Sequence, residues 1–323
     1  MILGHALGDA LGAPQEFPPF DEYIGELIPI RSQSRWQGIR VSALGQVTDD
    51  TEMAMCIFYA LQDGVYSRKQ AILEYMQWAN GKIPFLGKNT RNLFKGVKTI
   101  SGYESRRKKF ITDVPRNKWS QSNGCLMRAY PLALLHANAA EEDCKITNPA
   151  EICVEAVCIY TEALKYVLLG ASKDDVFAMV NTAITQPELR KAFDDAIEDR
   201  PRNIAESRGW VAHAFYAAFW CLRNFDNYHE AMRGIILHST QGRLRGDTDT
   251  NAAIAGALLG AYYGIDHLCA NRQTCENLRV LIRADTTTGD IPRPEKYHMN
   301  LHNFILLGRI AMQTELWKRA SHY

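Results

Sequence analysis

Two short segments, far apart in the chain, each place a pair of aspartates and threonine hydroxyls at the predicted start of an apolar helix. The first is VTDDTEMAMCIF at 47–58, and the second is RGDTDTNAAIAGALLGAYYG at 245–264. A single Asp or Thr side chain would suffice to cap a helix N-terminus. Neighbouring carboxylates repel each other and raise each other's pKa unless a cation neutralises them. Capping therefore leaves the second carboxylate of each pair unexplained.

A metal site would explain the additional carboxylate at each helix start. If the two helix starts meet in space, their four aspartates and several threonine oxygens form an all-oxygen site of the kind that suits Mg²⁺ or Mn²⁺ rather than zinc. Four negative charges exceed the need of one divalent ion, which favours two ions roughly 3.5–4 Å apart.

Two further segments combine small and polar residues. In GDALGAPQEF at 8–17, Gly8 and Gly12 permit close packing, and Glu16 follows Pro14, which we expect to end a helix. In SNGCLMRAYPLAL at 122–134, a turn of small residues is expected to open another helix. Glycines at 256, 260 and 264 share one helix face, so we expect a neighbouring helix to approach closely there.

Composition indicates a globular chain, and its balanced charge does not point to nucleic acid or an anionic membrane as an obligatory partner. The 323 residues are 46% hydrophobic, and 37 basic residues nearly balance 36 acidic ones. The eight cysteines are scattered without a CxxC pair, as buried thiols of a reducing compartment would be. Because no basic leader is present and the apolar stretch 252–264 is too short for a bilayer, we expect a cytoplasmic protein with no membrane contact.

Helical periodicity dominates the chain and predicts an all-α fold, which we expect to form one domain over 1–323. The predicted helices cover 51–62, 69–80, 124–137, 149–169, 173–184, 205–223, 228–238, 250–264 and 301–318. Two stretches, 17–42 and 99–122, are expected to be long loops. Residues 88–118 hold ten Lys or Arg against two acids, which indicates either a solvated surface or a cradle for phosphates.

The four segments, in this order, resemble the ADP-ribosylglycohydrolase family, from about residue 4 to residue 264. GDALGAPQE is similar to the family's N-terminal glycine-acid motif, TDDTEM to its first metal motif, NGCLMRAYPL to its substrate loop and RGDTDTNAAIAGALLGAYYG to its second metal motif. The resemblance implies an all-α orthogonal bundle with a binuclear Mg²⁺ or Mn²⁺ centre in a cleft.

The resemblance also assigns roles to residues. The implied metal ligands are Thr48, Asp49, Asp50, Asp247, Asp249 and Thr250. The implied substrate-binding residues are Gly87, Asn89, Thr90, Ser122, Asn123, Gly124, Cys125 and Met127. The implied catalytic residues are Glu16, Asp49 and Asp50, and the sequence leaves open which of them is the base.

The implied reaction is the hydrolysis of a glycosidic bond to ribose. Such a reaction passes through an oxocarbenium-like state, helped by a positioned water and a carboxylate that accepts its proton. The two ions would hold the ribose by its cis hydroxyls, and backbone N–H groups of the turn at 122–125 would suit the diphosphate.

The chain departs from the family's pattern at three places. The stretch PFLGKNTRNLF at 84–94 lacks an acid that many members carry near the metals. Asn148 stands where many members have a histidine, and Arg245 replaces the first of two glycines before the second metal motif.

We therefore expect an enzyme that removes ADP-ribose from a modified protein, with arginine as the expected acceptor and ADP-ribose as the product. Two alternatives remain. One is a hydrolase of ADP-ribosylated nucleic acid or of a free ADP-ribose derivative, for which the basic stretch is the hint. The other is a catalytically silent member like the lens crystallins that resemble this family. The lack of a heptad pattern is compatible with a monomer.

Overall fold

The computed structural model describes residues 1–16, 22–34, 38–81, 83, 86–115, 119–240, 245–314 and 316–317, without the side chains of residues 34, 62 and 137. In this part of the chain, α-helices dominate, and two small antiparallel hairpins are the β-structure. The predicted all-α fold is confirmed. None of the described helices combines the length and the apolar character that a bilayer crossing needs.

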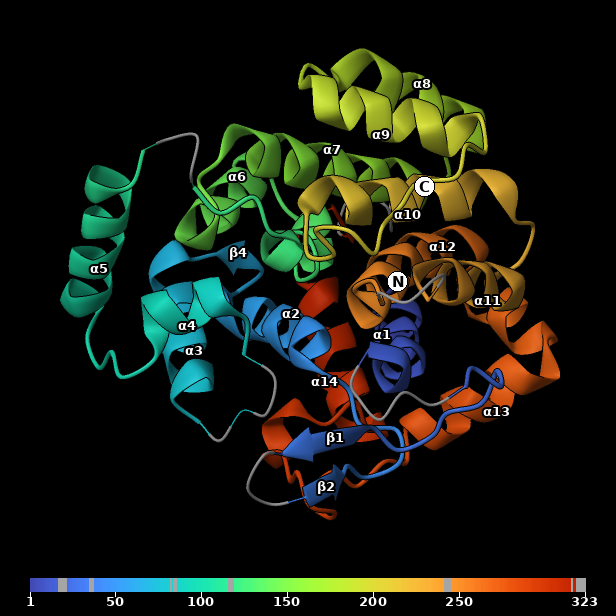
Figure 1. Cartoon of the computed structure of the whole chain (residues 1–323), viewed down its shortest axis with the longest axis horizontal. Coiled ribbons are helices and arrows are strands. Elements are labelled where there is room, and N and C mark those ends of the chain that lie inside the picture. Colours follow the sequence, from blue (N-terminus) through green and yellow to red (C-terminus); the bar gives the residue numbers. More distant parts are fainter. Residues whose placement is uncertain are drawn as a thin grey trace.

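Helices α1 (Ile2–Glu16) and α12 (Thr248–Ala270) form the centre of the molecule (Figure 1). Their backbones touch. A Cβ added to Gly8 would lie 2.2 Å from the carbonyl oxygen of Ala252, and one added to Gly12 would lie 2.4 Å from that of Thr248. Because real Cβ atoms cannot approach so closely, glycine is required on α1. The antiparallel contact brings the C-terminal end of α1 to the start of α12.

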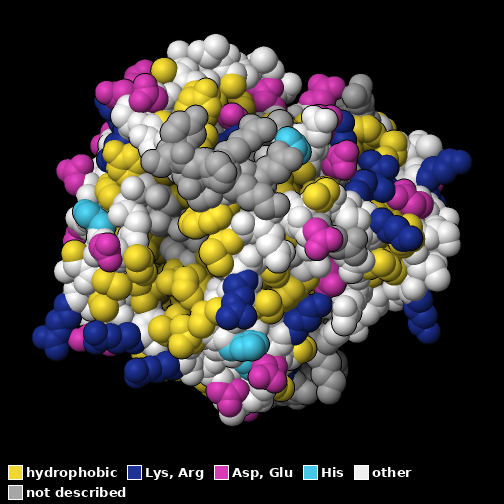
Figure 2. Space-filling view, turned by 180° about the vertical axis from the view of Figure 1, so that it is seen from behind, with side chains coloured by type: hydrophobic (Ala, Val, Ile, Leu, Met, Phe, Trp, Pro, Cys, Tyr) yellow, Lys and Arg dark blue, Asp and Glu magenta, His cyan; other side chains and the backbone are white. Residues whose placement is uncertain are grey.

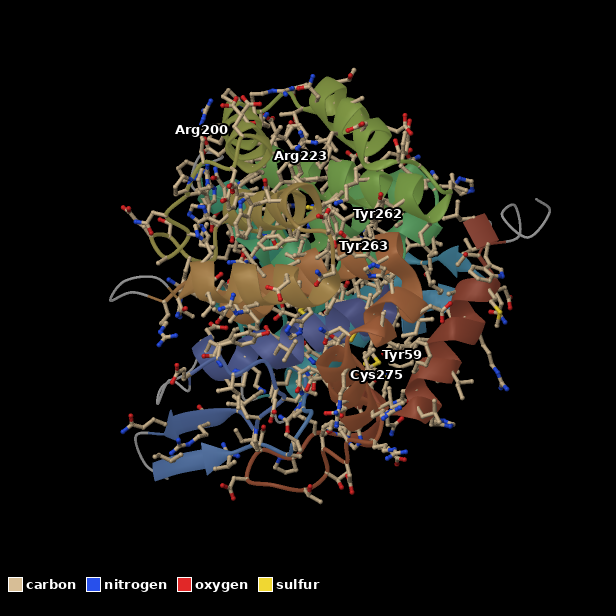
Figure 3. All side chains as sticks on the ribbon, turned by 90° about the vertical axis from the view of Figure 1, so that its right-hand side faces the viewer. Tyr59, Arg200, Arg223, Tyr262, Tyr263 and Cys275 are labelled. Atoms are coloured by element: carbon tan, nitrogen blue, oxygen red, sulfur yellow. The ribbon has the colours of Figure 1, made fainter. Side chains whose placement is uncertain are left out.

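Two of the three glycines of α12 pack against a neighbouring helix as predicted, and the third does not. Gly256 and Gly260 do lie against Gly4 of α1, which confirms the close approach there. The helix then runs past Tyr262 and Tyr263 (Figure 3) to Gly264, whose φ of 73° kinks it. A Cβ on Gly264 would meet no atom within 4 Å, so the prediction that this glycine packs against a helix was wrong. It provides a left-handed backbone conformation instead.

The other elements surround this pair. Helix α2 (Asp49–Ala60) lies beside α1, and α3 (Arg68–Asn80), α6 (Ala137–Thr147), α7 (Glu151–Leu168), α10 (Val211–Asn224) and α11 (Tyr228–Ser239) enclose the core. Figure 1 shows α8 (Lys173–Ala183) and α9 (Pro187–Ile197) at one end of the molecule. At the opposite end lies the hairpin of β1 (Arg31–Ser34) and β2 (Gly38–Val41), which pairs Arg31 with Val41. The remaining elements are β3 (Leu61–Gln62), β4 (Val65–Tyr66), α4 (Lys88–Phe94), α5 (Ile100–Asp113), α13 (Arg272–Leu281) and α14 (Leu301–Met312).

Several predicted boundaries were wrong. The helix predicted at 124–137 is two short 3₁₀ helices, η2 (Asn123–Cys125) and η3 (Tyr130–Leu134), because Pro131 lacks an N–H and the turn closes with i→i+3 bonds such as Leu126 N to Asn123 O. The helix predicted at 205–223 begins only at Val211, and that predicted at 301–318 ends at Met312.

Other helices were missed or misjudged. The expected loop at 99–122 contains α5, capped by the Thr99 hydroxyl; since its one buried residue is Tyr103, it shows no apolar period. The expected loop at 17–42 contains the first hairpin, although 17–21 and 35–37 lie outside the described residues. Helix α1 continues through Pro14 to Glu16, so the prediction that Pro14 ends the helix was wrong by two residues. Helices α4, α6, α9 and α13 were not predicted.

The contact between α1 and α12 can be tested with Gly8→Ala. The added methyl group must displace backbone, so we expect the free energy of unfolding to fall by about 3 kcal/mol or more in denaturant titration. The matched control is Gly308→Ala on α14, where a Cβ meets no atom within 4 Å and the change should be neutral or stabilising. Equal stability of the two variants would contradict the contact.

Candidate active site

Asp9 joins α1 to the start of α2. Its buried carboxylate accepts hydrogen bonds from the backbone N–H of Thr48 and Thr51 and from both hydroxyls, the shortest being 2.6 Å from Thr51 Oγ1. Asp9 thus caps α2 from another helix. The sequence prediction missed this role; the available signal was a lone carboxylate inside an apolar helix.

The other acids gather next to this cap. Carboxylate oxygens of Asp9, Asp50 and Asp249 lie within 4.8 Å of one another, and so do those of Glu16, Asp247 and Asp249. Asp249 belongs to both groups. The two helix starts that the sequence singled out therefore meet, and Glu16 from the end of α1 joins them.

The cluster has too few hydrogen-bond donors for its carboxylate oxygens. The Thr48 hydroxyl lies 2.9 Å from an oxygen of Asp9, 3.0 Å from Asp50 and 3.4 Å from Asp249, but it carries one proton. Oδ1 of Asp50 is buried and has no hydrogen-bond partner. A buried carboxylate oxygen without a partner is costly, and a bound cation would satisfy it.

Burial and mutual repulsion make these acids reluctant to ionise. Burial and then the charge of Asp247 raise the pKa of Glu16 to about 8, and burial raises that of Asp9 to about 6. Burial followed by the charges of neighbouring acids raises the pKa values of Asp49, Asp50 and Asp249 well above their usual range. The arrangement favours protons or metal cations at this place.

These residues fit divalent metal ions with a preference for oxygen ligands. Asp50, Asp247, Asp249 and Glu16 supply carboxylates, as Mg²⁺ and Mn²⁺ prefer. Asp9 is less suited, because a carboxylate has about four lone-pair sites and Asp9 already accepts bonds from four donor groups. We assign to it the positioning of Thr48 and α2.

One known protein family has a sequence pattern that this chain matches. The family model of the ADP-ribosylglycohydrolases matches residues 1–291. The chain belongs to the ADP-ribosylglycohydrolase family. This confirms the resemblance read from the four sequence motifs.

Individual relatives of this family share about a quarter of their residues with the chain. ADP-ribosylarginine hydrolase Tri1 of Pseudomonas putida is 26% identical over 285 residues, which cover 82% of this chain and 70% of that one. ADP-ribosyl-[dinitrogen reductase] glycohydrolase of Rhodospirillum rubrum is 25% identical over 275 residues, covering 83% and 85%. A solved ADP-ribosylglycohydrolase-related protein complex has the same fold, with a TM-score of 0.62 and 24% identity over 99% of this chain and 96% of that one.

The acids lie on one side of a cavity of about 880 Å³. Of the metal ligands predicted from the sequence, Asp49, Asp50, Asp247, Asp249 and Thr250 line the cavity, and Thr48 is buried beside them. The predicted substrate-binding residues that line it are Gly87, Asn89, Thr90, Ser122, Asn123, Gly124 and Met127. Cys125 does not: its buried Sγ lies 3.6 Å from the carbonyl oxygen of Ser122, behind the loop.

The turn at 122–125 differs from the expected helix start. The N–H of Asn123 donates to the carbonyl of Gly209 at 2.8 Å, so this donor is already used. The Asn123 side chain instead donates to Asp247 at 2.7 Å. The neighbouring segment brings in Arg208, 4.0 Å from Glu16, a cavity residue that the sequence prediction missed because no motif surrounds it.

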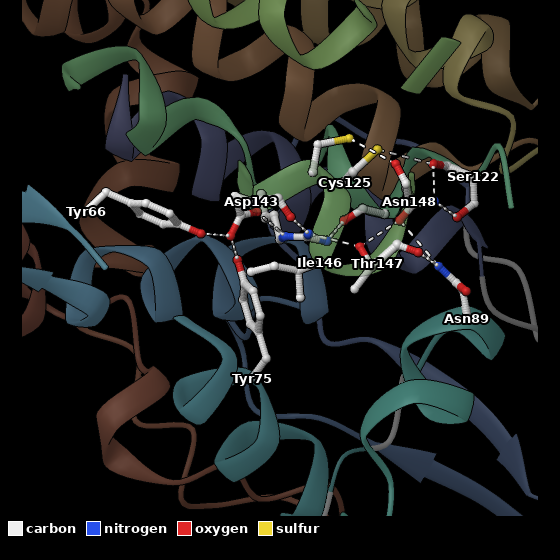
Figure 4. Close-up of polar contacts among 12 residues, drawn as sticks. Tyr66, Tyr75, Asn89, Ser122, Cys125, Asp143, Ile146, Thr147 and Asn148 are labelled. Carbon is white, nitrogen blue, oxygen red and sulfur yellow. Dashed lines mark hydrogen bonds and ion pairs between the residues drawn. The ribbon is translucent and has the colours of Figure 1, made fainter. Parts of the chain in front are cut away.

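A buried network holds this turn (Figure 4). The fully buried Arg128 donates to the carbonyl of Gly124 at 2.6 Å and to the carboxylate of Asp143 at 2.9 Å. The hydroxyls of Tyr66 and Tyr75 donate to the other oxygen of Asp143, at 3.0 and 2.8 Å. Every charge of the pair thus has hydrogen-bond partners, which is what makes a buried ion pair tolerable.

Asn148 continues the network to both walls of the cavity. Its side-chain oxygen accepts from the Thr147 hydroxyl at 2.7 Å, and its NH₂ group donates to the carbonyl oxygen of Ser122 at 3.2 Å. Asn89, from α4, donates to the carbonyl of Thr147 at 2.8 Å. Asn148, which stands where many family members have a histidine, therefore links Asn89 of α4 to the turn at 122–125.

The acid cluster predicts a pH-dependent stability of the metal-free protein. Since Glu16 and Asp9 have raised pKa values in the folded state, the folded protein holds protons that the unfolded chain has released. We expect the Tm in chelator to fall as the pH rises from about 4 to about 8.

Metal should reverse that trend, because a cation replaces the protons. At a thousandfold excess over Kd, Mg²⁺ or Mn²⁺ should add about 4 kcal/mol of stability at neutral pH, measured by thermal unfolding. Asp249→Asn should weaken both effects. Identical curves of Tm against pH with and without metal would refute the metal assignment.

The Arg128–Asp143 pair can be tested by Arg128→Met. The variant leaves a buried carboxylate without its cation, so we expect a loss of about 3–5 kcal/mol in the free energy of unfolding. The control is Arg68→Met, whose ion pair with Glu104 has side chains 34% and 42% exposed and should contribute about 1 kcal/mol or less. Similar losses in the two variants would contradict the role of burial.

Proposed function

We propose that this chain is a divalent-metal-dependent hydrolase that releases ADP-ribose from a modified protein, with arginine as the acceptor residue. The observation that carries the proposal is the pair of three-carboxylate groups that share Asp249 beside the cavity. The cavity volume of about 880 Å³ lies within the range of small-molecule sites. The relatives from P. putida and R. rubrum are named for action on ADP-ribosylarginine and on an ADP-ribosylated dinitrogen reductase.

In this proposal, Asp50, Asp247 and Asp249 would hold two divalent cations, with Thr48, Asp49 and Thr250 around them and the carboxylate of Glu16 beside them. When bound, such cations supply Lewis-acid stabilisation of ribose oxygens and lower the pKa of a nearby water. The protein's own part is to hold these oxygens in place, and Asp9 and Asn123 do so by fixing Thr48 and Asp247.

For the proton acceptor we favour Glu16 among the three candidates. Its side chain is 10% exposed and lines the cavity, so water and substrate can reach its carboxylate, whereas Asp50 is buried deeper. Water attacks the anomeric carbon, the bond from that carbon to the guanidine nitrogen breaks, and the proton of the water passes to Glu16. The proton then passes from Glu16 to the leaving nitrogen, so one water is added across the broken bond and the products are ADP-ribose and arginine.

The test is release of ADP-ribose from arginine-, serine- and DNA-linked substrates in Mg²⁺, in Mn²⁺ and in chelator. Asp249→Ala should abolish release in a folded protein, and Glu16→Gln should lower kcat by about 10²–10⁴-fold with little change in KM. The control is Asp226→Asn, a fully exposed carboxylate outside the cavity. Full activity in chelator or in Asp249→Ala would refute the proposal, and a folded, metal-binding protein without activity on any substrate would favour the silent, crystallin-like alternative.

A further inference from the structure

Helices α4 and α5 carry a positive charge that the proposed hydrolysis does not use. The described residues 86–115 contain eight cations, Lys88, Arg91, Lys95, Lys98, Arg106, Arg107, Lys108 and Lys109. They contain two acids, Glu104 and Asp113. We call the exposed side of these two helices and of the segment between them, which carries Lys95 and Lys98, the α4–α5 face. Of its cations, only Lys88 and Arg91 line the cavity, so a phosphate cradle inside the site accounts for little of this charge.

Among the residues that the structure describes, the cations of this face form no ion pair with a carboxylate of another element. Arg106 donates to the backbone carbonyls of Asn92 and Lys95, and Arg107 donates to that of Lys145. Backbone carbonyls carry no net charge, so these bonds hold the cations without cancelling them. Glu104 is occupied by Arg68 of α3 at 3.0 Å. The whole chain has a net charge of only +1, so the excess is local.

The α4–α5 face begins at the mouth of the cavity. Phe110 and Val114, at the end of α5, line the cavity together with Lys88 and Arg91 of α4. From there α5 extends along the edge of the molecule, and it has a single buried residue, Tyr103 (Figure 1). Figure 2, seen from behind, shows Lys and Arg side chains gathered at the right-hand edge, the side on which α5 lies.

The lining of the cavity outside the acid cluster is also positively charged. Its charged residues there are Lys88, Arg91 and Arg208, all of them cations. An acceptor chain that leaves the cavity past this rim meets positive charge. Complementary potentials steer partners together and fix their orientation.

We propose that the α4–α5 face docks an acidic surface of the acceptor protein, next to the modified residue. The inference rests on the proposed function and names the chemistry of its substrate. A protein fits better than a nucleic acid, because single strands are usually bound by exposed aromatic side chains that stack on bases. The two aromatic residues of α5 are not on the face: Tyr103 is buried and Phe110 lines the cavity.

The experiment uses the full chain with bound metal and three substrates. These are free ADP-ribosylarginine and two peptides with one ADP-ribosylated arginine, flanked either by aspartates or by asparagines. At low salt, the wild-type kcat/KM should be about tenfold higher for the acidic peptide than for the neutral one. The preference should decline as NaCl is added, because the charges are exposed.

Lys108→Glu/Lys109→Glu should remove the preference and leave kcat/KM for free ADP-ribosylarginine unchanged. The two lysines are exposed and do not line the cavity. The matched control is Arg233→Glu/Arg309→Glu, which makes the same change of net charge at exposed positions of α11 and α14 and should keep the preference.

Three results would overturn the docking proposal. They are equal kcat/KM for the two peptides in the wild type, an equal loss of preference in the control variant, and faster cleavage of an ADP-ribosylated oligonucleotide with the same lysine dependence. Failure of the hydrolase proposal is recognised separately, since free ADP-ribosylarginine would then stay intact. In that case, binding of the unmodified acidic peptide to the wild type, but not to the lysine variant, still measures the docking.

Discussion

The backbone contact between α1 and α12 is the constraint on which the site depends. With Gly8 and Gly12 against Ala252 and Thr248, no side chain separates the two helices. The end of α1 therefore reaches the start of α12, and Glu16 joins Asp247 and Asp249. A larger residue on α1 would separate these acids by moving the backbone on which they stand.

The site concentrates negative charge where the fold gives it little relief. Burial and mutual repulsion raise the pKa values of the acids, and an oxygen of Asp50 lacks a partner. Such an arrangement costs stability in the metal-free protein, and the glycine-packed helices and the Asp9 cap hold it together. A cation bound at the cluster would remove both the repulsion and the unmet hydrogen bonding.

The network around Arg128 and Asp143 differs from the acid cluster, because its buried charges are compensated. Arg128 and Asp143 are buried, but each charge is compensated by its partner and by hydroxyls or carbonyls. The network reaches Ser122 through Asn148 and α4 through Asn89. Satisfied polar groups thus hold the turn at 122–125, whereas the acid cluster contains an unsatisfied carboxylate oxygen.

The sequence by itself determined the helical class, the two acidic helix starts and their chemical kind, because apolar periodicity and an excess of carboxylates are local properties. It could not show Asp9 as a cap, since its donors Thr48 and Thr51 lie on another helix. Nor could it show α5, which has hardly any apolar face, or Arg208 beside Glu16. These features are contacts between distant segments, and only tertiary packing brings such segments together.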